Sequence, residues 1–177
     1  MSEATGPTGK SPHAFMREAL GVQSRLREDR RAVVAAALAA EVAALAAGSG
    51  YAASAVDAYF TARALEQEAP QPQPGRLQAA SYSAGAFADL VHIFEMLAAD
   101  DPTLAANSVA LIGDAVRELA QRPLAGRSAE EGLRERAVSR GRTGYVVLYR
   151  HLELDGLVLI LAIRHRYDAG YPNAEAP

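Results

Sequence analysis

The sequence predicts an α+β protein, with helices in the N-terminal half and a helical hairpin followed by strands in the C-terminal half. Two observations predict this class. Apolar residues recur at helical spacing, with clear start and stop signals, as far as Arg122-Pro123, and three runs with strand character follow. The 177 residues are 50% hydrophobic and 22% charged, so the chain has enough apolar surface for a packed core.

Composition excludes several classes of protein. Cysteine is absent, which excludes a disulfide framework and cysteine-based zinc sites. The net charge of −3 is not the bulk positive charge of a protein that coats nucleic acid. No run approaches the ~18 consecutive apolar residues of a membrane helix, and the first ten residues lack the layout of a signal peptide. We therefore expect a cytoplasmic protein with no cofactor and no membrane partner.

A proline-rich stretch separates two unlike parts of the chain. Pro70, Pro72 and Pro74 alternate with glutamine. Because proline lacks an N–H donor and favours extended geometry in its predecessor, we expect a polyproline-like spacer here. The expected organisation is a helical segment at 1–68, this Pro/Gln linker at 69–76, a second domain at 77–171 and a tail at 172–177.

Three helices are expected before the linker. Ser11-Pro12 starts the first, which Gly21 ends or weakens. The second covers about Leu26–Ala47 and stops at Gly48-Ser49-Gly50, and the third covers about Ser54–Gln67. The second helix is mostly alanine, so the three offer little apolar bulk to one another, and we expect them to dock on the second domain rather than form a separate core. The expected docking residues are Tyr51, Val56, Tyr59, Phe60 and Leu65.

The second domain has sharper signals. Ser83 can cap a helix with an apolar stripe from Phe87 to Ala98, and Asp101-Pro102 starts another helix close behind it, which predicts an antiparallel helical hairpin. The apolar run of the last predicted strand implies burial on both faces, hence a central position. The predicted strands are a weak edge strand at Leu77–Ser81, then Leu133–Val138, Tyr145–Arg150 and Leu157–His165.

Four stretches of the second domain, in this order, resemble the toxins of ParE/RelE-type bacterial toxin–antitoxin modules, most closely the ParE branch. They are Tyr82–Ile93 (Tyr-Ser-x-x-Ala-x-x-Asp-Leu-x-x-Ile), Pro123–Arg127, Gly144–Arg150 and Ala162–Arg166 with the following Asp168–Tyr171. The resemblance spans about 95 residues. It implies an α+β fold in which the helical hairpin packs on a small, curved, antiparallel sheet.

The first segment resembles the cognate, ParD-like antitoxin, through Gly9–Leu20, Gly48–Ala52, Tyr59 and Ala62–Ala64. In that family an N-terminal strand and two helices form a ribbon-helix-helix dimer on DNA, and the tail wraps the toxin. Only ten residues precede Ser11 here, too few for the ribbon and the first helix, so direct DNA binding is not expected. The segment at 10–67 is therefore expected to cover the toxin-like domain.

A net positive balance is confined to residues 132–171 in the C-terminal third, where seven arginines face four acidic residues. Two readings stay open for it: a patch that grips phosphate or an acidic protein surface, or a solvated sheet face offset by acids. The expected target-binding residues are Arg142, Arg150, Arg164 and Arg166. The arginines of this third are Arg134, Arg136, Arg140, Arg142, Arg150, Arg164 and Arg166.

Catalytic residues are only weakly indicated. His165 is a candidate general acid or base for RNA cleavage, as in the RelE branch, but a structural histidine is the favoured reading. Its neighbours Arg164 and Arg166 are weak catalytic candidates with it. Tyr171, like Tyr167, is read as a packing or antitoxin-contact residue and ranks as a weak catalytic candidate. No metal site is expected, because His13, His92 and His151 have no ligand spacing, and Gly141 and Gly144 are read as a hairpin turn.

The sequence therefore predicts a toxin and its antitoxin in one chain. By resemblance, the ParE-like part would inhibit DNA gyrase without catalysis, and the antitoxin-like part would neutralise it in cis or from a second copy in a homo-oligomer. The alternatives are a RelE-type ribosome-dependent mRNA endonuclease, for which the single lysine, Lys10, is unfavourable, and an inactive fused interaction module.

Overall fold

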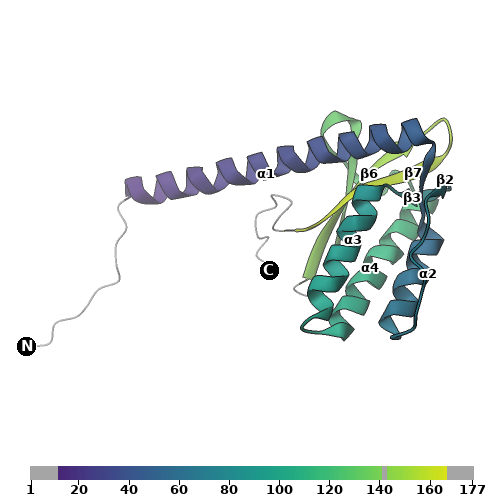
Figure 1. Ribbon diagram of the computed structural model, residues 1–177. Helices are drawn as coiled ribbons and strands as arrows, with labels where there is room; N and C mark the ends of the chain where they lie inside the picture. The colour runs from purple at the N-terminus through teal and green to yellow at the C-terminus, as the bar shows by residue number, and fades with distance from the viewer. Residues whose placement is uncertain (1–11, 141–142, 167–177) are drawn as a thin grey trace, which may run out of the picture.

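The computed structural model describes residues 12–140 and 143–166 (Figure 1). Helices and strands follow one another as the α+β prediction expects. In chain order they are α1 (Pro12–Ala47), β1 (Ser49–Ala52), α2 (Ala53–Ala64), β2 (Gly75–Arg76), β3 (Ala80–Tyr82), α3 (Ala84–Ala98), α4 (Pro102–Gln121), β4 (Arg127–Ser128), a 3-10 turn at Glu130–Gly132, β5 (Arg134–Arg140), β6 (Thr143–Leu152) and β7 (Leu157–His165).

The strands form one sheet in the order β2-β1-β3-β7-β6-β5-β4. β7 is central and buried on both faces, as its unbroken apolar run predicts. The sheet is mixed rather than antiparallel, because β3 runs parallel to β7 and all other pairs are antiparallel. The expectation of an edge strand at Leu77–Ser81 was wrong: β3 is buried, since β1 pairs along its other side.

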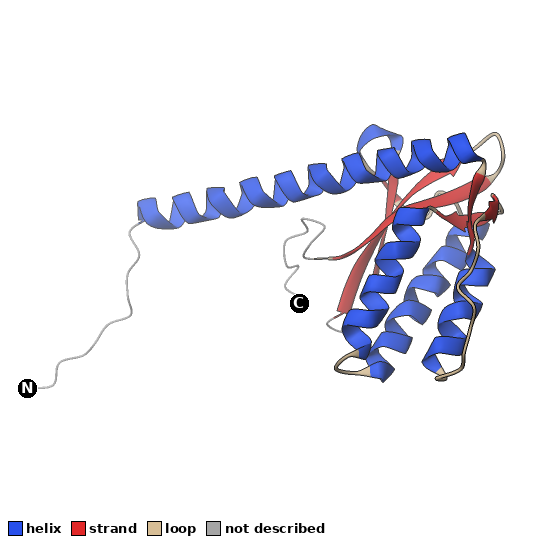
Figure 2. Cartoon of the chain, viewed as in Figure 1, coloured by secondary structure: helices blue, strands red, loops and turns tan. Residues whose placement is uncertain are grey.

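Helices α2, α3 and α4 pack on one face of the sheet (Figure 2). The predicted caps of the hairpin are present: the Ser83 hydroxyl accepts from the Ala86 N–H at 3.1 Å, and Asp101 Oδ1 accepts from the Leu104 N–H at 2.9 Å. The core between helices and sheet joins both halves of the chain, because it includes Val56 and Phe60 of α2 as well as Leu90, Ile112 and Ile160.

Helix α1 covers the opposite face. Successive side chains of a strand point to opposite faces of the sheet. Leu148, Leu159 and Leu161 point away from the helical hairpin. They pack with Val34 and Ala37 of α1. One helix of 36 residues replaces the two that were expected. A glycine inside a helix costs only about 1 kcal/mol, so Gly21 does not interrupt it.

Three short strands, β1, β2 and β4, were not foreseen, because they are defined by their partners rather than by an apolar pattern. Gly48, at φ +61°, ends α1 as predicted, and β1 follows at once. A Cβ on Gly50 would lie 2.9 Å from the Tyr82 carbonyl oxygen, so glycine permits the close approach of β1 to β3. The end of the proline-rich stretch forms β2, which pairs with Ser49 and Gly50.

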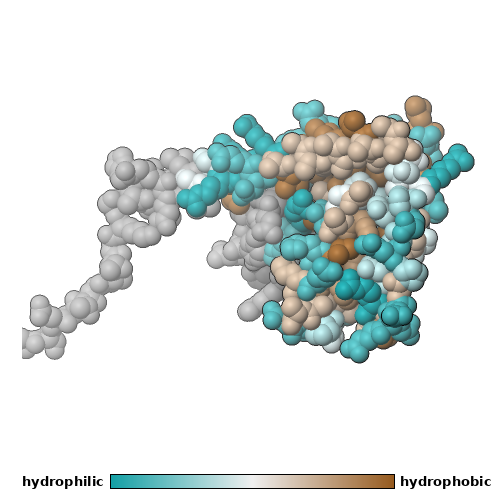
Figure 3. Space-filling view, viewed as in Figure 1, coloured by the Kyte–Doolittle hydropathy of each residue, from teal (hydrophilic) through white to brown (hydrophobic). Residues whose placement is uncertain are grey.

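The N-terminal part of α1 extends well beyond the rest of the described chain (Figure 1). Its C-terminal part carries alanine and two larger apolar side chains, Val42 and Leu45, on the side facing solvent (Figure 3). Within 12–140 and 143–166, no helix combines the length and the apolar character needed to cross a membrane.

Candidate functional site

The seat of α1 on the sheet is the most extensive contact between the N-terminal segment and the strands. The α1 residues in this seat recur at intervals of three and four and therefore lie on one side of the helix: Arg30, Val34, Ala37, Glu41 and Ala44. Val34, Ala37 and Ala44 are buried, with Ala37 fully so. The seat is thus an apolar seam with a charged side chain near each end.

Glu41 and Arg150 form the ion pair at one end. The Nε and Nη2 atoms of Arg150 each donate to a different oxygen of the Glu41 carboxylate at 2.7 Å, a bidentate fork. The third donor, Nη1, bonds the Glu131 carbonyl oxygen at 2.9 Å. Both side chains are largely buried, at 20% exposed for Arg150 and 12% for Glu41. The hydrogen bonds to Glu41 raise the pKa of Arg150, so the guanidinium stays charged at any physiological pH.

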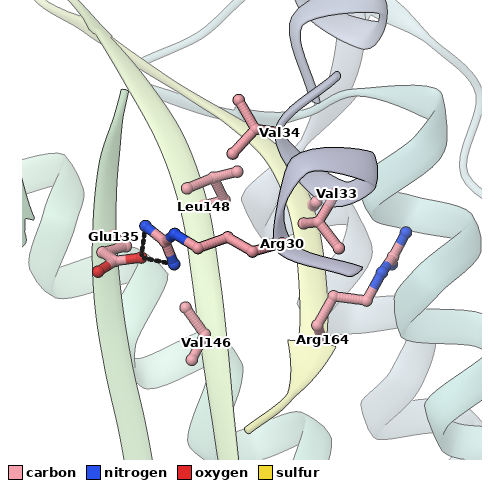
Figure 4. A pocket seen from close by; sticks show the side chains of 8 residues that line it. Arg30, Val33, Val34, Glu135, Val146, Leu148 and Arg164 are labelled. Carbon is pink, nitrogen blue, oxygen red and sulfur yellow. Dashed lines mark hydrogen bonds and ion pairs between the residues drawn. The ribbon is translucent and has the colours of Figure 1, made fainter. Parts of the chain in front are cut away.

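Arg30 and Glu135 form the pair at the other end (Figure 4). Two guanidinium nitrogens of Arg30 lie 3.3 Å from Oε2 of Glu135, whose side chain is only 4% exposed. Arg127 binds the other carboxylate oxygen of Glu135, and Arg30 also reaches Glu130 at 3.1 Å. A buried carboxylate needs partners of opposite charge. Through Arg30, α1 therefore helps to compensate the negative charge of Glu135 on β5.

Strand β1 and helix α2 dock on the helical hairpin through aromatic side chains. The Tyr51 ring stacks on Phe87 at 4.6 Å between centroids, and Phe60 lies 5.4 Å from Phe94. Val56 and Phe60 are buried and Tyr59 is half-buried against the same core. These four predicted docking residues therefore contact the hairpin core, whereas the fifth, Leu65, is 63% exposed.

The arginines that the sequence singles out, where the structure describes them, have separate partners. Arg164 pairs with Asp89 of α3, and Arg136 pairs with Glu118 of α4 at 2.7 Å. Arg134 donates to the carbonyl oxygens of Leu124 and Gly126. Together with Arg150, these positions correspond to a sheet whose arginines are offset by acids and carbonyl groups. Arg142 and Tyr171 lie outside the described residues, as does Tyr167, and Arg166 lies at the end of β7 beside Gly144.

His165 packs against an aromatic ring of the neighbouring strand. Its ring meets Tyr145 edge to face, with 5.6 Å between centroids. His92 is exposed on α3 and His151 lies on β6. Among the residues that the structure describes, no three histidines or carboxylates come together as a metal site.

A polar contact between α2 and α4 was missed from the sequence, because its two members are 60 residues apart. Asp57 accepts a hydrogen bond from Arg117 at 2.6 Å, and Arg117 also binds Asp114. Gly113 makes room for this carboxylate, since a Cβ there would lie 2.6 Å from Asp57 Oδ1. Burial raises the pKa of Asp57, and Arg117 opposes this shift without cancelling it.

The raised pKa of Asp57 has a measurable consequence. Between the usual aspartate pKa of about 3.9 and its higher value in the fold, the folded chain binds more protons than the unfolded chain, so stability falls as pH rises. Asp57→Asn removes this contribution. We compare the free energy of unfolding of Asp57→Asn with that of wild type by urea titration. We expect the value for the variant minus the value for wild type to become more positive from pH 3 to pH 6. Movement in the opposite direction would contradict the shift.

The comparison with known families agrees with this arrangement. A family model described as the ParE toxin of the parDE type II toxin–antitoxin system matches residues 80–169, just over half of the chain. The chain belongs to the ParE toxin family. A search of curated proteins finds no match.

The ParE match covers only one part of the fold. It begins at β3 and includes the α3–α4 hairpin and strands β4 to β7, so it contains Arg150, Arg164 and the strands β6 and β7 on which α1 lies. α1, β1 and α2 lie outside it. The ParE part is thus covered on both faces by a preceding segment of the same chain, and type II toxins of this family pair with antitoxins.

Proposed function

We propose that this chain is a ParE-type toxin that carries its own antitoxin-like segment. Residues 77–171 are the toxin, and residues 1–68 cover it, joined by the linker at 69–76. The observation that carries the proposal is the burial of α1 and α2 on opposite faces of the ParE part. Ala37 is fully buried there, and the bidentate Glu41–Arg150 pair is a contact of the kind that a cognate partner makes.

By resemblance to the ParE branch, the toxin binds DNA gyrase in the cytoplasm, without catalysis of its own. The linker keeps the covering segment near its site at an effective concentration on the order of millimolar. Neutralisation therefore depends on the balance between covered and uncovered states of one chain rather than on the supply of a second protein. Weakening the seat of α1 should release toxicity.

The full chain with Ala37→Glu tests this proposal, with Ala36→Glu as the matched control. Ala37 is fully buried and Ala36, one residue earlier on the same helix, is exposed. An unpaired charge at Ala37 costs about 3 kcal/mol or more, which shifts the balance toward the uncovered state by on the order of 100-fold. On induction in bacteria we expect growth arrest with Ala37→Glu and normal growth with wild type and Ala36→Glu.

The purified Ala37→Glu chain should also block DNA supercoiling by gyrase, whereas the Ala36→Glu chain should not. Cleaved transcripts with normal supercoiling would contradict the gyrase assignment and indicate a ribonuclease. Equal growth of all three strains, with the variants present as folded protein by circular dichroism, would contradict the toxin reading itself.

A further inference from the structure

The guanidinium of Arg150 is held in place by the ParE part itself. Glu131 and Gly132 both have positive φ, +55° and +70°, and this turn directs the Glu131 carbonyl oxygen to Nη1 of Arg150 at 2.9 Å. A Cβ on Gly132 would lie 2.7 Å from the same nitrogen, and the positive φ of residue 132 is one that glycine adopts without strain. Positive φ at a non-glycine residue such as Glu131 is uncommon. This turn therefore gives Arg150 one anchor that belongs to the ParE part and not to α1.

The remaining donors of Arg150 define the ligand. With Nη1 on Glu131, Nε and Nη2 form a parallel fork that matches the two oxygens of a carboxylate, and Glu41 fills this fork at 2.7 Å on both sides. The surrounding floor is apolar, with Leu148 and Leu159 buried on the same face. A site of this kind accepts a helix that carries one carboxylate on an otherwise apolar side.

Docking of α1 does not in itself require this charge pair. Glu41 is the only charged residue of the 16 from Ala32 to Ala47, and it is the one placed on Arg150. A buried ion pair contributes little net stability, because desolvation of both groups offsets their attraction, and an apolar pair of similar volume would hold the helix at least as well. The pair therefore specifies which side chain the ligand must present at this site, a carboxylate, beyond what adhesion of an apolar helix needs.

We propose that the Arg150 fork, oriented by Glu131 and Gly132, is the carboxylate-binding site through which the toxin engages a helical segment of its protein target, and that Glu41 occupies it as an internal mimic. This inference rests on the proposed function. It assigns two roles to one arginine: Arg150 holds the cover when α1 is seated and holds the target when α1 is displaced.

Growth assays separate this from a purely structural role of Arg150. Arg150→Ala removes one partner of a buried ion pair and therefore releases α1, as Glu41→Ala does. If Arg150 served only to hold α1, both variants would stop growth. We expect instead that Glu41→Ala arrests growth and Arg150→Ala does not. In the opened chain, Ala37→Glu with Arg150→Ala should restore growth, whereas Ala37→Glu with Arg136→Ala, a control on the other face of the sheet, should remain toxic.

The outcomes are distinguishable. If Ala37→Glu alone permits growth, the proposed function fails and the target site fails with it. If Ala37→Glu arrests growth and still does so with Arg150→Ala, the toxin reading stands and the inference is overturned. Arg150→Lys guards against misfolding, since it keeps the positive charge but cannot form the fork. It should lose most of the toxicity of the opened chain while its circular dichroism spectrum is unchanged.

A binding measurement tests the ligand class separately. A fluorescent peptide of residues 26–47 should bind the Ala37→Glu chain, and the peptide with Glu41→Gln should bind at least 10-fold more weakly by anisotropy. Against Ala37→Glu with Arg150→Ala the two peptides should bind alike, because the fork that distinguishes them is gone. Equal binding of both peptides to the Ala37→Glu chain would overturn the carboxylate assignment.

Discussion

Phe60→Ala is expected to lower the free energy of unfolding of the whole chain by about 3–5 kcal/mol. Phe60 is 3% exposed and lies among Tyr59, Phe87 and Phe94, so its removal leaves a cavity between α2 and the hairpin. For a chain of this size the loss corresponds to a fall in melting temperature of about 6–20 °C. Thermal unfolding followed by circular dichroism measures it.

Leu65→Ala is the matched control, because it removes a large apolar side chain from the same segment where 63% of the residue is exposed. We expect a change within about 0.5 kcal/mol. A small effect of Phe60→Ala, similar to that of Leu65→Ala, would mean that α2 rests on the ParE part without sharing its core. Two separate unfolding transitions in the wild-type chain would contradict the shared core in the same way.

Gly126→Ala is expected to cost about 2–5 kcal/mol. A Cβ at this position would lie 2.5 Å from the Tyr149 hydroxyl oxygen and 2.7 Å from the Glu135 carbonyl oxygen. The clash is with backbone as well as side chain, and it breaks a buried contact in which Tyr149 accepts from the Gly126 N–H at 3.0 Å and donates to the Pro123 carbonyl oxygen at 2.7 Å. Urea unfolding gives the loss.

Gly85→Ala is expected to raise the free energy of unfolding. Gly85 is in α3, and a Cβ there would be 3.8 Å from its nearest neighbours, which is ordinary contact. Because alanine favours helix over glycine, the variant should gain up to about 1 kcal/mol. If Gly126→Ala loses no more stability than Gly85→Ala, the close approach of residue 126 to Tyr149 does not determine its cost.

The hairpin and the central strand could be predicted because their signals are local. Ser83 and Asp101 mark the starts of α3 and α4 by their own capping chemistry, and the apolar run of β7 reports burial on both faces. β1 and β2 could not, since two- and four-residue strands exist only through the pairing of Gly50 with Gly75 and of Tyr51 with Tyr82. The parallel β3–β7 pair depends on the path of the chain between them.

The α1 seat shows the same division. Arg150 was among the predicted binding residues, because an arginine at the end of an apolar strand is visible in the sequence. Its partner Glu41 is 109 residues away, and nothing local distinguishes it from any other glutamate on a helix. The same holds for Arg30 and Glu135, which are 105 residues apart. Residue identity could be predicted, whereas pairing needed the folded chain.

The position of β7 has a consequence for how the protein matures. β7 is the last strand of the described chain, and yet it joins β3 to β6 in the middle of the sheet and supplies Leu159 and Leu161 to the surface beneath α1. During synthesis, the residues of α1 and α2 leave the ribosome before those of β7. The sheet on which they pack is incomplete until β7 has been synthesised. The surface of the ParE part beneath α1 is therefore completed only after the segment that packs on it has been synthesised.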